Sequence, residues 1–156
     1  MRILGLDPGL ATTGYAILDI EKGKKKLLTC GVIRTAAGLS LGTRLKEIHE
    51  DFTSLLAEFK PEICSIEQIF FSKNVTTGIA VSHARGILIL CLEEASIPVT
   101  EFSPSQMKSA LTGDGRADKK NIQKMVMLEL GLAAPPQPDD AADAVSLALS
   151  LAATVR

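Results

Sequence analysis

The sequence has little of what would build a disulfide framework or a zinc site. Its three cysteines, Cys30, Cys64 and Cys91, are odd in number, far apart and set in apolar runs. Its two histidines, His49 and His83, lie in helical patterns with no partner at ligand spacing. We therefore expect reduced cysteines in the core and structural histidines, rather than disulfides or zinc ligands.

Long apolar runs and an excess of one charge are also missing. No apolar run approaches the ~20 residues that a membrane span needs. The first residues enter a strand pattern without the regions of a signal peptide, so a cytoplasmic protein is expected. The formal net charge of −1 is unlike the strongly basic charge of many nucleic-acid-binding domains. Between residues 102 and 124, however, five Lys or Arg stand against two Asp, which permits a local basic patch.

What is present is a succession of strand and helix patterns. No repeat, linker or low-complexity tract divides the 156 residues, so a single domain over 1–156 is expected. Strand patterns cover 2–7, 12–20, 26–35, 62–68 and 97–102, and helical patterns cover 40–60, 75–95, 104–111, 118–130 and the segment from 139. This order predicts an α/β protein with a mixed sheet, three antiparallel strands followed by two parallel strands, and helices on both faces.

Two of these strands end in an acid. Asp7 closes the first strand and Glu67 closes the fourth. If the two strands are neighbours, both carboxylates emerge at one edge of the sheet, where sites of α/β proteins collect. Taken alone, Asp7 also fits a turn residue and Glu67 an ordinary surface acid.

The final helix begins with an acidic cluster, in the stretch "PPQPDDAADAVSLALSLAATV". Asp139, Asp140 and Asp143 fall at the start of an otherwise apolar helix. Helix capping, with an Asp as N-cap and acids near the positive end of the helix dipole, is one explanation. The other is that the helix packs on the sheet and brings Asp140 and Asp143 to the two strand-end acids.

Four clustered acids would repel one another, and burial would raise their pKa values. A cation would offset this cost, and oxygen ligands suit Mg²⁺ or Mn²⁺. Two such ions about 3.5–4 Å apart can activate a water and stabilise the leaving oxygen of a phosphodiester. The pattern therefore favours a metal-dependent nuclease.

Four motifs, in this order and at these separations, resemble the RuvC family of Holliday-junction resolvases in the ribonuclease H-like superfamily. They are "LGLDPGLATTGYAIL", "SIEQIFFSKN", "ARG" at 84–86 and "DAADAVSLAL". The resemblance implies a ribonuclease H-like fold and a crossover junction endodeoxyribonuclease of recombination and repair. It further implies a homodimer that cuts two opposed strands of a four-way DNA junction, with the RuvA and RuvB branch-migration complex as partner.

The resemblance also assigns the metal site. The family's metal-binding catalytic acids fall on Asp7, Glu67, Asp140 and Asp143, which would hold two Mg²⁺ ions per subunit, with Mn²⁺ as a substitute. Asp139 is then the spare acid and the expected N-cap.

DNA contacts are implied in the loop after the fourth strand and in the basic stretch: Phe70, Lys73, Asn74, Lys108, Lys119 and Lys120. Phe70 matches the family's aromatic wedge, with its neighbour Phe71 as the alternative. One supporting lysine matches Lys108, and the other matches Lys119 within one residue, which leaves Lys120 open. These lysines would meet phosphate charge.

Three other functions remain open from the residues alone. A nucleotide-binding module of the actin and sugar-kinase type also begins its phosphate loop at an Asp and a Gly after the first strand. A ribonuclease H-like nuclease could act on RNA instead. A junction-binding dimer without catalysis is the third, although the complete set of four acids argues against it.

Overall fold

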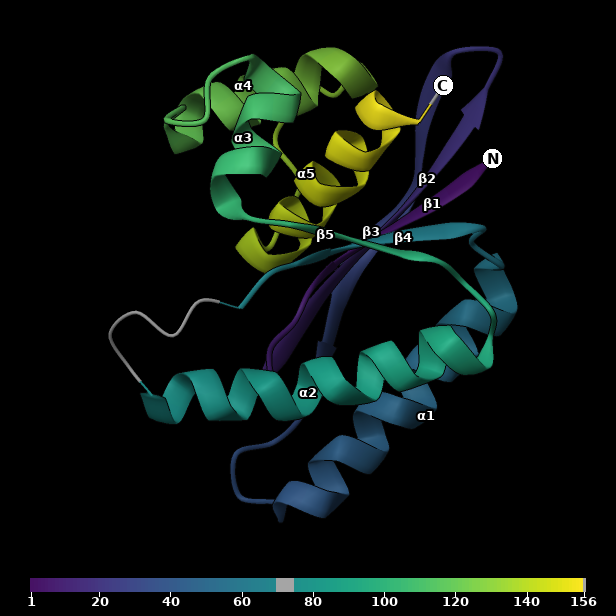
Figure 1. Cartoon of the computed structure of the whole chain (residues 1–156), viewed down its shortest axis with the longest axis vertical. Helices are drawn as coiled ribbons and strands as arrows, with labels where there is room; N and C mark the ends of the chain where they lie inside the picture. The colour runs from purple at the N-terminus through teal and green to yellow at the C-terminus, as the bar shows by residue number, and fades with distance from the viewer. Residues whose placement is uncertain (70–74, 156) are drawn as a thin grey trace.

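Five strands form one sheet in the part of the chain that the computed structural model describes, residues 1–69 and 75–155. Their order across the sheet is β3-β2-β1-β4-β5 (Figure 1). The first three strands pair antiparallel, whereas β4 joins β1 and β5 joins β4 in parallel. The bounds are β1 Arg2–Asp7, β2 Thr12–Glu21, β3 Lys24–Arg34, β4 Ile63–Glu67 and β5 Val99–Phe102. The mixed sheet expected from the sequence is therefore confirmed.

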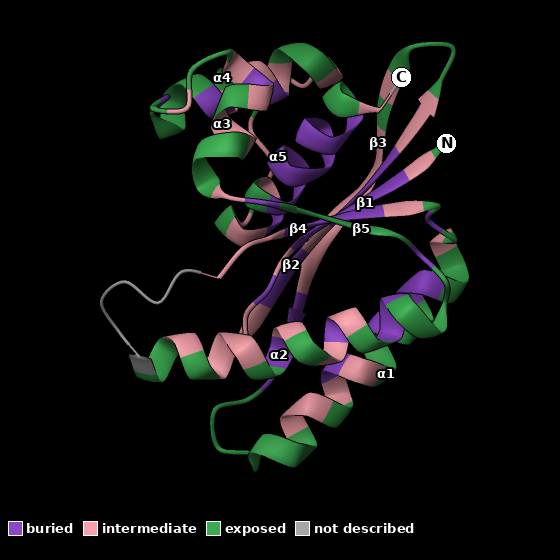
Figure 2. Ribbon diagram, viewed as in Figure 1, coloured by how far each residue is buried: buried purple, intermediate pink, exposed green. Residues whose placement is uncertain are grey.

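Helices cover both faces of this sheet (Figure 1). One face packs against the first two helices around a core that includes Leu4, Leu6 and Leu88. The other face packs against the last three helices around a core that includes Ile3, Ala144 and Ala148. The helices are α1 Leu41–Phe59, α2 Val75–Glu94, α3 Pro104–Thr112, α4 Lys119–Leu130 and α5 Asp139–Thr154. Buried residues concentrate where α5 crosses the sheet (Figure 2).

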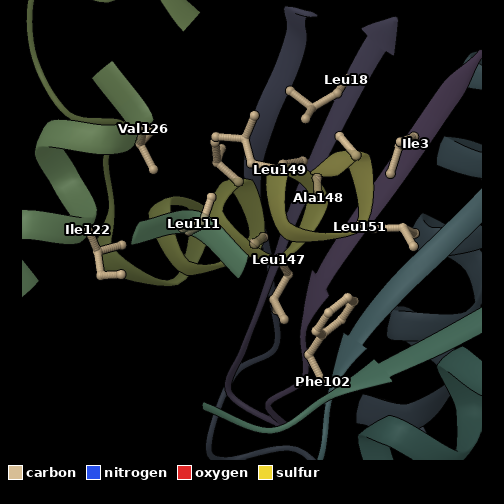
Figure 3. Close-up of a cluster of buried hydrophobic side chains, with 14 of the residues drawn as sticks. Ile3, Leu18, Phe102, Leu111, Ile122, Val126, Leu147, Ala148, Leu149 and Leu151 are labelled. Carbon is tan, nitrogen blue, oxygen red and sulfur yellow. The ribbon is translucent and has the colours of Figure 1, made fainter. Parts of the chain in front are cut away.

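The last helix, α5, is buried along most of its length. Leu147, Leu149 and Leu151 are at most 2% exposed and pack in a cluster that includes Ile3 and Phe102 (Figure 3). Full burial of one such side chain contributes about 1.5–3 kcal/mol. The helix is therefore held firmly against β1 and β2, whatever the chemistry at its first turn.

The polar residues of α5 do not form a solvated stripe. Ser146 and Ser150 are 2% and 0% exposed. Their hydroxyls donate to backbone carbonyls one turn earlier, Ser146 to Ala142 at 3.0 Å and Ser150 to Ser146 at 2.8 Å. Small hydroxyl residues satisfied in this way let the helix pack closely on its neighbours.

Two glycines let α5 approach the sheet. A Cβ atom at Gly5 of β1 would collide with the carbonyl oxygen of Ala144, and one at Gly14 of β2 would collide with that of Asp140. Any larger residue at either position would push the helix away from the strands. Gly14 therefore sets the distance between β2 and the acidic end of α5.

The expected N-cap of α5 is wrong. Pro138 occupies the N-cap position, where it makes no side-chain capping hydrogen bond, and Asp139 is the first residue inside the helix. The carboxylate of Asp139 pairs instead with Lys119 Nζ at 2.8 Å. Proline suits a helix start because it supplies no backbone N–H that would need a partner.

The hairpin between β2 and β3 is also tighter than expected. The turn occupies only Lys22 and Gly23, whose φ angles are 49° and 78°, and β3 begins at Lys24. Two consecutive positive φ angles are typical of the hairpin turn that matches the twist of a sheet. The lysines that follow therefore belong to the strand.

Cys64 and Cys91 are buried free thiols, as expected for core residues, whereas the free thiol of Cys30 is half-buried. Within residues 1–69 and 75–155, no helix is both long and apolar enough to cross a membrane.

Candidate active site

Asp7 and Glu67 lie side by side on the face of the sheet that α5 covers. The parallel register pairs Leu6 with Ile66, so the residues that follow are adjacent at the carboxyl ends of β1 and β4. Side chains alternate along a strand, and Leu6 and Ile66 belong to the core under α1 and α2. Asp7 and Glu67 therefore point to the opposite face, the one on which α5 packs.

The first turns of α5 bring two further acids to this place. Asp140 and Asp143 raise the pKa of Asp7 by their negative charge, and Asp143 acts in the same way on Glu67. The close contact between Gly14 and the backbone of Asp140 holds this end of the helix against the sheet. The structure thus gathers the four acids, from three elements that are distant in sequence.

Asp7 is the most perturbed of these acids. Its pKa is raised from 3.8 to about 8, first by burial and then by the charges of Glu67, Asp143 and Asp140. A hydrogen bond between the side chains of Asp7 and Glu67 raises the pKa of Asp7 and opposes the rise in that of Glu67. This hydrogen bond therefore favours the proton on Asp7 and the charge on Glu67.

Glu67 and Asp143 also have raised pKa values. For Glu67 the cause is burial, followed by the charge of Asp143. For Asp143 it is loss of water around the carboxylate, which the nearby charge of Lys119 opposes. Asp143 lies at the exposed rim of the cluster, so solvent screens its interactions more than those of Asp7.

The chemistry of this cluster fits a hard divalent cation. Four carboxylates supply only oxygen ligands, and a cation would relieve the repulsion that raises the pKa of Asp7. In the described part of the chain, however, no three His, Cys, Asp or Glu residues are arranged so that they could hold one ion. The acids therefore converge on one place without forming a complete coordination sphere among the described residues.

Two of the predicted lysines lie at this cluster. Lys108 of α3 lines a cavity together with Glu67 and Asp143. Lys119, the first residue of α4, pairs with Asp139 and lies near enough to Asp143 to lower its pKa. Lys120 is exposed and forms no ion pair with any described residue. The geometry therefore favours Lys119 over Lys120 as the lysine beside the acids.

The other predicted DNA contacts, Phe70, Lys73 and Asn74, lie outside the described residues, as does the alternative Phe71. Their roles stay predictions.

Sequence reasoning missed an arginine that supports the site. Arg85 of α2 is 17% exposed, and its guanidinium pairs with Glu101 of β5 at 2.8 Å. Its Nε also points to the backbone carbonyl of Glu67, at 3.4 Å. Arg85 thus links α2 to the ends of β4 and β5. The motif at 84–86 contained this residue, but nothing in the sequence showed which carbonyl it would meet.

Comparison with known proteins is consistent with this arrangement. The sequence profile of the family described as "Crossover junction endodeoxyribonuclease RuvC" matches residues 3–151. The protein of that name from Prochlorococcus marinus (strain MIT 9303) is 46% identical over 150 residues, covering 96% of this chain and 97% of the relative.

Two solved structures of Thermus thermophilus RuvC have the same fold as this chain. The first superposes with a TM-score of 0.92 at 34% identity, covering 98% of this chain and 94% of that one. The second, in complex with Holliday junction substrate, has a TM-score of 0.93 at 32% identity, covering 99% and 94%. Sequence and fold agree over nearly the whole length, and the chain belongs to the RuvC family of crossover junction endodeoxyribonucleases.

Proposed function

We propose that this protein resolves four-way DNA junctions by hydrolysing phosphodiester bonds symmetrically in two opposed strands, in recombination and repair. The observation that carries the proposal is the meeting of Asp7, Glu67, Asp140 and Asp143 at one end of the sheet, in a chain of the RuvC family. Residues 1–156 would act as one nuclease domain, because the single sheet and its two cores extend from β1 to α5.

Each acid has a defined role in the proposal. Asp7 and Glu67 would hold the cations from the sheet, while Asp140 and Asp143 would hold them from α5. Two Mg²⁺ ions, or Mn²⁺ in their place, supply an activated water and neutralise charge on the phosphate. Because burial and the neighbouring acids raise the pKa of Asp7 to about 8, a cation held there would favour loss of its proton.

The surroundings of the acids suit a phosphate backbone. Lys108 and Lys119 stand at the rim of an otherwise acidic site, where they would attract the DNA strand. The remaining contacts, Phe70 as junction wedge and Lys73 and Asn74 beyond it, rest on the family resemblance. We further propose that the enzyme acts in the cytoplasm, with RuvA and RuvB as partners in branch migration, which the family resemblance supports.

The exposed side of α2 supports a homodimer. Ile79 and Leu90 are each 49% exposed, and at 100° per residue they fall on one face of the helix together with His83 and Gly86. A Cβ atom at Gly86 would meet nothing within 4 Å. The two exposed apolar side chains would gain from being covered, and Gly86 lets another backbone come close. A second copy of α2 therefore fits this face.

One assay separates the proposed activity from its alternatives. A synthetic four-way junction, a linear duplex of the same sequence and an RNA–DNA hybrid are incubated with the protein, with Mg²⁺ and with EDTA. Paired nicks in opposed strands of the junction, in Mg²⁺ only, support the proposal. Faster cleavage of the hybrid indicates a nuclease that acts on RNA. Junction binding without cleavage in Mg²⁺ indicates a binding protein.

A further inference from the structure

We propose that a pocket beside the acidic cluster binds a backbone phosphate of the DNA substrate, with the guanidinium of Arg44 as its cationic contact. The proposal rests on the DNA-cleaving function proposed above. The pocket has a volume of about 480 Å³ and lies between the β1–β2 turn and the first turns of α2. Its lining includes Gly9 and Thr12 from the turn, Arg44 from α1, Thr76 from α2 and Asp140 from α5.

Arg44 is held in place by one buried hydroxyl. Its Nε donates to Thr35 Oγ1 at 2.8 Å, and Thr35 is 8% exposed. The same hydroxyl donates to the carbonyl of Leu10 at 2.6 Å. The side chain of Arg44 is thus fixed against the β1–β2 turn before any ligand arrives, so little conformational entropy is lost on binding.

The turn that forms the pocket floor is itself fixed. Thr13, with no exposed surface, donates from its hydroxyl to the carbonyl of Gly9 at 2.7 Å. The backbone N–H of Thr35 donates to the carbonyl of Ala11 at 3.1 Å. This turn directly follows Asp7, so a strand bound here continues toward the acidic cluster.

The charges around Arg44 suit an anion. Arg44 forms no ion pair with any carboxylate in the described ranges, and of its three guanidinium nitrogens only Nε has a hydrogen-bonding partner there. Its two terminal nitrogens therefore present the forked donors that match a phosphate.

Asp140 on the pocket wall decides which anion fits. Its carboxylate opposes a freely diffusing anion, so inorganic phosphate alone should bind weakly. A phosphate that belongs to a DNA strand is held at several points and can tolerate this repulsion. The geometry therefore points to a subsite for the substrate strand and not to a site for a small phosphate ligand.

The test measures junction affinity in EDTA as a function of KCl concentration, for wild type, Arg44→Gln, Arg44→Lys and the control Lys46→Gln. Lys46 lies on the same helix, is 73% exposed and, among residues 1–69 and 75–155, forms an ion pair with Glu50 alone, so its change removes the same charge outside the pocket. For Arg44→Gln we expect about tenfold weaker binding at low salt. The slope of log affinity against log salt should also fall by about one per bound subunit. Arg44→Lys should keep the slope, and the control should match wild type in both.

The results separate this proposal from the proposed function. If wild type neither binds nor cuts a junction, the proposed function is contradicted, and so is the Arg44 subsite that rests on it. If wild type binds and cuts, but Arg44→Gln has the affinity and slope of Lys46→Gln, only the subsite is wrong. Should Arg44→Gln fail to fold by circular dichroism, Thr35→Val and Arg44→Lys decide. If both of these variants bind the junction as tightly as wild type, the subsite is wrong. If they bind more weakly and the slope of log affinity against log salt is unchanged, the subsite is supported.

Discussion

At the scale of single residues, the most distinctive property of the site is the raised pKa of Asp7. Its pKa is about 8 because burial and three neighbouring acids disfavour the charged form. In the unfolded chain the same carboxyl ionises near its ordinary value of 3.8. The folded state therefore binds more protons between these values, and stability falls as the pH rises through them when no metal is present.

Asp7→Asn should remove most of this pH dependence. In EDTA, the carboxyl of Asp7 should make wild type lose stability as the pH rises from 5 toward about 8. At pH 8 the variant should be more stable than wild type by roughly 2–4 kcal/mol, after allowance for solvent screening. Urea unfolding at pH 5, 6.5 and 8 measures the difference. Equal pH dependence in both proteins would show that Asp7 is not buried among charges.

Replacing Asp143 should also stabilise the protein in EDTA, by a smaller amount than replacing Asp7. Capping would make Asp143→Asn slightly destabilising, because a favourable dipole interaction would be lost. Asp143 instead lies beyond the first turn and has a raised pKa, even with Lys119 nearby. We expect Asp143→Asn to raise the melting temperature in EDTA by roughly 1–2 °C, and the gain to shrink or reverse in millimolar Mg²⁺. A lower melting temperature in EDTA would return Asp143 to the capping role.

At the scale of elements, the strand ends were predictable and the helix contacts were not. Acids that close two strands expected to be neighbours placed Asp7 and Glu67 at one edge of the sheet, and the pairing of β1 with β4 confirms that placement. The N-cap was wrong because the pairing of Asp139 with Lys119 joins residues distant in sequence, and local propensity cannot show such a contact. The same is true of Arg85 and of the Arg44–Thr35 contact. Gly5 and Gly14 did carry a signal, since a glycine inside a strand indicates close backbone approach.

The exposed face of α2 that carries Ile79 and Leu90 leads to a prediction about the oligomeric state. Leu90→Glu should convert a dimer to a monomer, because it would bury two charges where two apolar side chains meet. Leu128→Glu is the matched control, since Leu128 on α4 is 75% exposed and away from that face. Sedimentation measures the oligomer, and nicking of junctions with both strands labelled measures symmetry. A dimeric Leu90→Glu variant that nicks both strands together would place the interface elsewhere.

At the scale of the whole molecule, binding and chemistry are assigned to different side chains. The four acids end strands and begin a helix that packs firmly on the sheet, whereas the proposed DNA contacts lie around them: Lys108, Lys119 and Arg44. Removing one acid should therefore stop hydrolysis while the junction still binds. Activity and affinity are separable in this arrangement, because different side chains would supply them.

The most direct test compares Glu67→Gln with wild type on a four-way junction. Glu58→Gln, an exposed change on α1, is the matched control. In Mg²⁺ we predict that Glu67→Gln cleaves at least about a thousandfold more slowly, while its junction affinity in EDTA stays within about twofold of wild type. The control should match wild type in both measurements. Cleavage by Glu67→Gln at the wild-type rate, or a loss of binding in proportion to the loss of cleavage, would contradict a catalytic role for the acidic cluster.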